Sequence, residues 1–124
     1  MPQTEVLLFA EEDGSCPFLE WLDGLPSKVQ DKCYVRIERL EEMGHELRRP
    51  EADYLRDGIH ELRASFRGIH YRILYFFAEQ GAIISHGTIK EQKVPEKAID
   101  LTIARMNAFN GDPLKHTYEG RADR

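Results

Sequence analysis

The sequence has little cysteine, no long apolar run and no excess of positive charge, and each absence excludes a class of protein. Two cysteines among 124 residues are too few for a disulfide scaffold or a zinc site of their own, so Cys16 and Cys33 are expected to be free, buried thiols. No apolar run approaches the ~18 residues of a membrane span, and the N-terminus lacks the basic and apolar regions of a signal peptide. We therefore expect a cytoplasmic protein with no membrane partner.

Several motifs that carry common chemistries are missing as well. The five histidines are scattered through the chain, and no spacing typical of metal ligands connects them. Neither Ser15 nor Ser65 lies in a nucleophile-elbow pattern, and there is no glycine-rich phosphate loop. We therefore expect neither a metal ion nor a cofactor.

The net charge of −5 is distributed unevenly along the chain. Residues 1–47 contain 11 acidic and 4 basic side chains, a net charge of −7, whereas residues 48–124 contain 11 acidic and 13 basic ones, a net charge of +2. A site for a polyanion depends on local rather than total charge, so the second segment remains compatible with a phosphate-bearing partner.

The hydrophobic periodicity predicts a single α+β domain, in which a small antiparallel sheet packs against helices in the order β-α-α-β-β-β-α. We expect this domain to cover residues 1–110 and a loose polar tail to cover residues 111–124. Apolar spacing of three and four residues predicts the helices, alternation predicts the strands, and no clean period appears over residues 45–57, which we interpret as a connector. The expected strands cover residues 5–10, 59–66, 69–78 and 82–90, and the expected helices cover residues 17–25, 27–43 and 95–109.

Alternation over the two central strands divides their side chains between two faces. If Arg67-Gly68 is a two-residue turn, Phe66 pairs with Ile69 and the register of the whole hairpin follows. The first face is then apolar and forms the core, backed by the helices, and the second face is largely polar. The first face contains Leu62, Ala64, Phe66, Ile69, Tyr71, Ile73, Tyr75 and Phe77, and the second contains Glu61, Arg63, Ser65, His70, Arg72, Leu74 and Phe76.

In this register Arg63 lies directly opposite Arg72 on the second face. Like charges directly opposite each other destabilise a sheet unless another group compensates them. Glu61 is one candidate for that group, and a bound phosphate is another. Because its side chain leaves the core, Arg72 is expected to contribute little to stability, whereas Tyr71 is expected to be buried.

Two lysines follow the last expected strand, close to the start of the final helix. A helix N-terminus favours anions, so Lys90 and Lys93 could hold a phosphate there, although an ordinary charged loop would have the same composition.

Three blocks of sequence together resemble the RelE/HigB toxin superfamily, in particular its phage-derived Gp49-like branch. They are Glu46-Leu-Arg-Arg-Pro50, then Leu55-Arg-Asp-Gly-Ile-His-Glu-Leu-Arg63, then Gly68-Ile-His-Tyr-Arg-Ile-Leu-Tyr-Phe-Phe77. The pattern continues with a strand that ends in His86-Gly-Thr, a lysine-bearing loop and a helix that begins at Pro95.

This resemblance implies a toxin of a type II toxin–antitoxin pair that cleaves mRNA on the ribosome without a metal ion. In such an enzyme the 2′-hydroxyl attacks the adjacent phosphate, and basic side chains stabilise the transition state and move protons. By motif, Arg72 would hold the scissile phosphate, Lys90 would contact phosphate or assist proton transfer, and Arg63 would support them. Arg67 and Lys93 are expected to bind RNA, and the expected protein partner is an antitoxin of the helix-turn-helix type.

The sequence also departs from the family pattern. Many relatives have an aromatic residue where Thr88 stands and a second lysine where Glu91 stands, so a negative charge lies beside the expected phosphate site. This leaves two alternatives open: a catalytically weakened homologue that binds the antitoxin and regulates the operon, and a ParE-like inhibitor of topoisomerase.

Overall fold

The computed structural model describes residues 4–119 and contains the predicted α+β fold. Its elements, in chain order, are β1 (Val6–Leu8), α1 (Pro17–Asp23), α2 (Ser27–Met43), the short 3-10 helix η1 (Gly44–Glu46), β2 (Ala52–Arg56), β3 (Ile59–Phe66), β4 (Ile69–Ala78), β5 (Gly81–Lys90) and α3 (Glu96–Gly111).

The strands form one mostly antiparallel sheet in the order β1-β5-β4-β3-β2. Only the short β1 runs parallel to its neighbour, β5, and the other three pairs are antiparallel. The central strand β4 therefore has a strand on each side, and apolar residues on both of its faces are buried.

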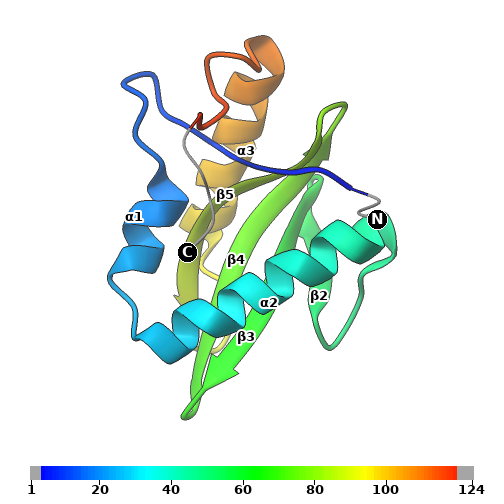
Figure 1. The fold of residues 1–124 in the computed structure, drawn as a ribbon. Coiled ribbons are helices and arrows are strands. Elements are labelled where there is room, and N and C mark those ends of the chain that lie inside the picture. The colour runs from blue at the N-terminus through cyan, green and yellow to red at the C-terminus, as the bar shows by residue number, and fades with distance from the viewer. Residues whose placement is uncertain (1–3, 120–124) are drawn as a thin grey trace.

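Helices cover the two faces of the sheet unequally (Figure 1). The helices α1 and α2 pack on one face against Leu62, Ile73 and Tyr75, which confirms the face predicted as the core, although Ile69 beside the turn is exposed. The helix α3 packs on the other face, against Leu74 and Phe76. Alternation placed these two apolar residues on the otherwise polar face, and α3 is the element that buries them. The half of this face nearer the β3–β4 turn keeps its polar side chains.

The register predicted for the central hairpin is confirmed. Phe66 pairs with Ile69, and Arg63 pairs with Arg72. Both turn residues, Arg67 and Gly68, have positive φ angles, of 52° and 80°. Two consecutive residues of positive φ are typical of the turn whose twist matches that of the flanking strands, so the local backbone fixes which side chains share a face.

The segment interpreted as a connector contains an additional strand, β2, which pairs antiparallel with β3. Its short length and mixed burial hide the alternation that identifies the longer strands. A signal for it is nonetheless present, because Asp57-Gly58 separates β2 from β3 and both residues have positive φ angles, as in the other hairpin.

The chain after α3 is not loose where the structure describes it. His116 is buried, its ring stacks on Phe9 at 5.0 Å between centroids, and its Nδ1 lies 2.8 Å from the carbonyl oxygen of Ala10. The amide of Tyr118 donates to the carbonyl of Leu8. These contacts fix the tail beside β1 as far as residue 118, whereas the end of the predicted tail, residues 120–124, lies outside the described residues.

Both cysteines are free and buried, as predicted. Burial raises the pKa of the Cys33 thiol to about 11, so this side chain behaves as a small apolar group of the core. Among the described residues, no helix is long and apolar enough to span a membrane.

A glycine in β5 allows α1 to approach the sheet. A Cβ atom added to Gly87 would overlap the ring atoms of Trp21. The backbone of Gly87 does not have a positive φ, so its conformation alone does not require glycine. The requirement for glycine therefore comes from the close approach of the indole. The Trp21 ring also meets Tyr71 edge-on, at 6.4 Å between centroids.

We predict that Gly87→Ala lowers the free energy of unfolding by about 1–3 kcal/mol, because the methyl group would displace the indole from a well-packed core. Urea unfolding followed by tryptophan fluorescence measures the effect. Gly111→Ala is the control, since nothing lies within 4 Å of a Cβ added there. Equal stability of the two variants would contradict the role assigned to Trp21.

Candidate functional site

Cross-strand rows of side chains cover the half of the sheet that α3 leaves open. Residues that lie directly opposite in antiparallel strands point to the same face, with Cβ atoms about 4.5–5.5 Å apart. The third row from the β3–β4 turn contains the buried Leu74 and marks the border with α3. From the turn inward, the rows are Ser65, His70 and Lys90; then Arg63, Arg72 and Thr88; then Glu61, Leu74 and His86.

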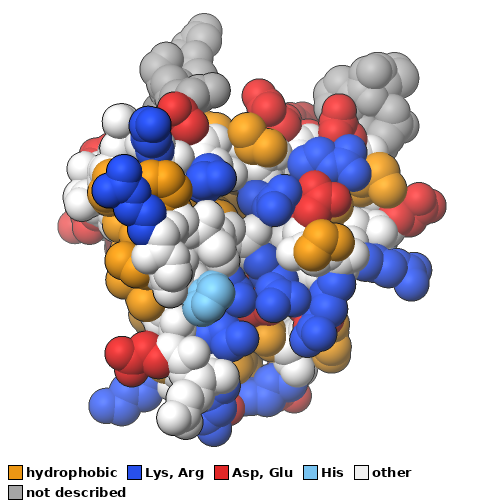
Figure 2. Space-filling model, turned by 90° about the horizontal axis from the view of Figure 1, so that it is seen from below, with side chains coloured by type: hydrophobic (Ala, Val, Ile, Leu, Met, Phe, Trp, Pro, Cys, Tyr) orange, Lys and Arg blue, Asp and Glu red, His pale blue; other side chains and the backbone are white. Residues whose placement is uncertain are grey.

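The first two rows form the floor of an open pocket with a volume of about 400 Å³. The helix α2 and the loop before β2 complete its wall. Figure 2 views the end of the molecule where the β3–β4 turn lies in Figure 1, and shows Lys and Arg side chains gathered in the middle of this surface beside a histidine. The lining contains four basic residues and no acidic one: Arg36, Pro50, Arg63, Ser65, His70, Arg72 and Lys90.

The two facing arginines are compensated by Glu61, one of the two candidates that the sequence offered. Arg72 is only 2% exposed and Glu61 only 5%. Glu61 Oε1 lies 3.4 Å from Arg72 Nε, and Glu61 Oε2 lies 3.6 Å from Arg63 Nε. One carboxylate therefore lies between both guanidinium groups. The expectation that the Arg72 side chain lies on an open polar face is wrong, because this side chain is buried beside the carboxylate. Loss of Arg72 is therefore expected to affect stability.

Burial dominates the electrostatics of this pair. Burial raises the pKa of Glu61, although Arg72 and Arg63 act in the opposite direction. Burial likewise lowers the pKa of Arg72 against the attraction of Glu61. Both charged forms are thus costly to bury, and each depends on the other for compensation.

The guanidinium of Arg72 keeps one nitrogen available. Its Nη1 donates to the carbonyl of Tyr71 at 3.0 Å, and its Nε faces Glu61 without a well-aligned hydrogen bond. Its Nη2 has no partner among the residues that the structure describes. Because Arg72 also lines the pocket, Nη2 is the atom best suited to contact a ligand there.

Arg36, which was not among the predicted site residues, reaches the pocket from α2. Its Nε donates to the carbonyl of Arg63 at 2.7 Å, and its Nη1 lies 3.3 Å from Glu51 Oε2. Glu51 also accepts from Arg39 Nε at 2.8 Å, so α2 is tied to the loop before β2. The available signal was helical spacing, because Arg36 lies three residues after Cys33 and four before Leu40, which α2 buries against the sheet.

His70 is a second pocket residue that was not among the predicted site residues. Its Nδ1 lies 2.8 Å from Ser65 Oγ, which belongs to the same cross-strand row. Its pairing with Lys90 across β4 and β5 places three polar side chains side by side at the mouth of the pocket. The sequence signal for His70 was strand alternation, which places Ser65 and His70 on the face of Arg72.

The predicted catalytic residues Arg63, Arg72 and Lys90 meet in this pocket, but the two predicted RNA-binding residues lie outside it. Arg67 is in the turn, with its guanidinium over the Phe66 ring, and lines a different pocket. Lys93 is exposed after β5, and its Nζ lies 3.9 Å from Glu96 of α3. RNA binding by these two residues stays a prediction.

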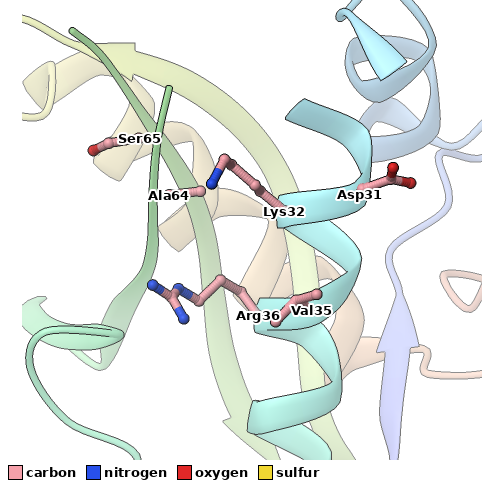
Figure 3. A pocket seen from close by; sticks show the side chains of 6 residues that line it. All are labelled: Asp31, Lys32, Val35, Arg36, Ala64 and Ser65. Carbon is pink, nitrogen blue, oxygen red and sulfur yellow. The ribbon is translucent and has the colours of Figure 1, made fainter. Parts of the chain in front are cut away.

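A second hollow, with a volume of about 260 Å³, continues from the pocket between α2 and β3. Arg36 and Ser65 line both hollows. Figure 3 shows Lys32 and Arg36 pointing from α2 toward β3, whereas Asp31 points away from it. The basic lining of the pocket is therefore extended around the edge of β3.

The described residues offer no metal site, since no group of three or more His, Cys, Asp or Glu side chains among residues 4–119 could hold an ion. What the pocket offers is a set of fixed cations, with guanidinium groups suited to bidentate contact with an oxyanion. A phosphate group is a ligand that matches this set.

Residues 20–107 match the family model described as phage-derived protein Gp49-like (DUF891). The chain belongs to this family. The match covers more than half of the sequence and includes every residue of the pocket. The Gp49-like family is associated with toxin–antitoxin systems, which suggests an antitoxin partner. No curated protein matches the chain.

We predict that Arg72→Ala destabilises the protein by about 3–5 kcal/mol at pH 8, because it leaves the Glu61 carboxylate buried without its nearest cation. The loss should be smaller at pH 5. Burial already raises the pKa of Glu61, and loss of Arg72 raises it further, so stability present at low pH is lost as pH rises through the folded-state pKa. Urea unfolding at the two pH values measures both effects.

The double variant Glu61→Gln with Arg72→Ala is expected to recover part of this loss at pH 8, since it removes the buried charge. Arg63→Ala is the control and should lose less stability than Arg72→Ala, because the Arg63 side chain is 24% exposed and lies farther from the Glu61 carboxylate. An Arg72→Ala protein as stable as the wild type at both pH values would contradict the pairing with Glu61.

Proposed function

We propose that this protein is the toxin of a type II toxin–antitoxin pair, of the RelE/HigB kind, and that it cleaves mRNA without a metal ion. The observation that carries the proposal is the convergence of Arg63, Arg72, Lys90 and Arg36 on one open pocket whose lining contains no carboxylate. Membership of a family associated with toxin–antitoxin systems supports it.

The chemistry proposed for this pocket is attack by a ribose 2′-hydroxyl on the adjacent phosphorus. An O2′–P bond forms, the P–O5′ bond breaks, and the products are a 2′,3′-cyclic phosphate and a 5′-hydroxyl end. Negative charge grows on the non-bridging oxygens in the transition state, where preorganised cations stabilise it most. Arg72 would hold these oxygens through Nη2, and Arg63 in the same row would add a second guanidinium.

Lys90 is the candidate to act on the leaving oxygen. It ends β5, lines the pocket, and lies one row from Arg72. An ammonium carries three donor protons and no acceptor, so it can give a proton to O5′ or hold a phosphate oxygen. We assign Lys90 to the leaving-group side of the scissile phosphate.

The buried Glu61 fits this role as a positioning group for the arginines. Because the Glu61 carboxylate holds both Arg63 and Arg72, these side chains need little rearrangement when a phosphate enters. Such preorganisation is the condition for electrostatic catalysis. The proposed setting is the cytoplasm, with mRNA on the ribosome as substrate and a helix-turn-helix antitoxin as partner.

A second candidate function is favoured by the same carboxylate and by the loop after β5. Glu61 offsets part of the positive charge of Arg72, and Glu91 adds an exposed negative charge directly after Lys90. A homologue weakened in this way would act by binding the antitoxin and regulating the operon. It would do so without cleaving RNA.

We predict that induced expression of the wild-type protein stops growth and creates new 5′ ends within coding regions, and that Lys90→Ala reduces cleavage by about 10²–10³-fold. Mapping of mRNA 5′ ends measures this in cells, and cleavage of a synthetic oligoribonucleotide measures it with purified protein. Thermal unfolding should be nearly unchanged, because Lys90 is partly exposed at the end of its strand.

Lys97→Ala is the matched control, since Lys97 is exposed on α3, on the far side of the buried residues of that helix, and does not line the pocket. It should cleave as the wild type does. Growth arrest with intact mRNA, or an operon repressed without any cleavage, would reject the nuclease and support one of the alternative functions.

A further inference from the structure

His70 differs from the other histidines of the protein in what surrounds it. His116 is buried and His86 is half-buried, and burial lowers the pKa of His86 to about 4. His45 and His60 stack on Phe77 and Tyr75, on the face that α2 covers. His70 alone among the described histidines lines the basic pocket, where it is exposed.

The hydrogen bond to Ser65 leaves one ring nitrogen of His70 for chemistry. Nδ1 is held 2.8 Å from Ser65 Oγ, so Nε2 is the free nitrogen. A serine hydroxyl can accept from Nδ1–H, which leaves a lone pair on Nε2. When Nε2 then takes a proton, Nδ1–H continues to donate to the same oxygen. The contact with Ser65 is thus compatible with both protonation states and keeps the ring in one orientation.

The groups that face His70 are cations from three other elements and from its own strand. Lys90 of β5 lies directly beside it, Arg63 of β3 and Arg72 of β4 lie in the next row, and Arg36 reaches the pocket from α2. Protonating the ring adds a positive charge to this set. A phosphate bound in the pocket would offset that charge.

We propose that His70 is the general base for the proposed RNA cleavage and that Ser65 is its positioning residue. This inference rests on the proposed function. Nε2 takes the proton of the 2′-hydroxyl as the O2′–P bond forms, and Lys90 gives a proton to O5′ as the P–O5′ bond breaks. One proton is taken and one is given, no water is consumed, and both groups lie in the same cross-strand row. In this proposal one group serves the attacking oxygen and the other serves the leaving oxygen of the same phosphate.

The experiment measures single-turnover cleavage of an oligoribonucleotide between pH 5 and pH 9. His70→Asn keeps an amide nitrogen near the position of Nδ1, and so can still contact Ser65, but it has no base. We expect its cleavage rate to fall by about 10²–10⁴-fold, with loss of the rise on the acidic side of the profile. Binding of the same oligonucleotide with 2′-deoxyribose at the cleavage site should change by less than about threefold, because phosphate contacts remain.

Ser65→Ala tests positioning. It should lower the rate less than His70→Asn does and should keep the rise on the acidic side, because the base is still present. The control variant is His45→Asn, on the other face of the sheet, and it should retain the profile of the wild type. Thermal unfolding identifies any loss of fold, and His70→Gln provides a second variant if His70→Asn is unstable.

The experiment distinguishes failure of the His70 assignment from failure of the proposed nuclease activity. If the wild-type protein cleaves and His70→Asn and His70→Gln cleave equally fast with the same pH profile, His70 is not the base and the nuclease proposal stands. If the His70 variants lose binding of the 2′-deoxy substrate in proportion to cleavage, the histidine is a binding residue, which also overturns this inference. A folded wild-type protein that cleaves no RNA overturns both.

Discussion

Two arginines face each other across β3 and β4, and a buried carboxylate in the next row allows them to do so. Without Glu61, Arg63 and Arg72 would repel each other, and a guanidinium that is 2% exposed would have no compensating charge. With it, three charged groups are fixed on the most buried strands of the sheet. Their positions are set before any ligand arrives, and the proposed function depends on this.

The strands β3 and β4 carry both the apolar core and part of the candidate site. On the face of Arg72, the helix α3 covers the apolar residues and leaves the polar ones open. Leu74 and Phe76 lie on the face of Arg72, two and four residues further along β4, beneath α3. Burial of this apolar surface, together with the core under α1 and α2, supplies the stability that offsets a costly charged cluster. If α3 extended over the whole face, the cations would be enclosed, and without it the sheet would expose an apolar strip.

The acidic first segment of the chain does not form the pocket, apart from one residue. This segment forms β1, α1 and α2, and from it Arg36 alone lines the pocket. Its contacts with the carbonyl of Arg63 and with Glu51 join α2 to the edge of β3 and to the loop before β2. The net acidity of the protein is therefore compatible with a locally basic site. In the proposed toxin, the acidic segment is left available to a partner with basic side chains.

The sequence by itself determined the elements other than β2 and the short η1, the central hairpin register and the pairing of Arg63 with Arg72, because turn chemistry and alternation are local properties of the chain. Asp57-Gly58 shows that even β2 left a local signal. The burial of Arg72, the contribution of Arg36 from α2 and the position of α3 depend instead on contacts between segments that are distant in the chain. Alternation specifies the face on which a side chain lies, and only the packing of other elements decides whether that face meets water. For this reason the same pattern that placed Arg72 correctly could not tell a solvent-exposed arginine from one buried beside Glu61.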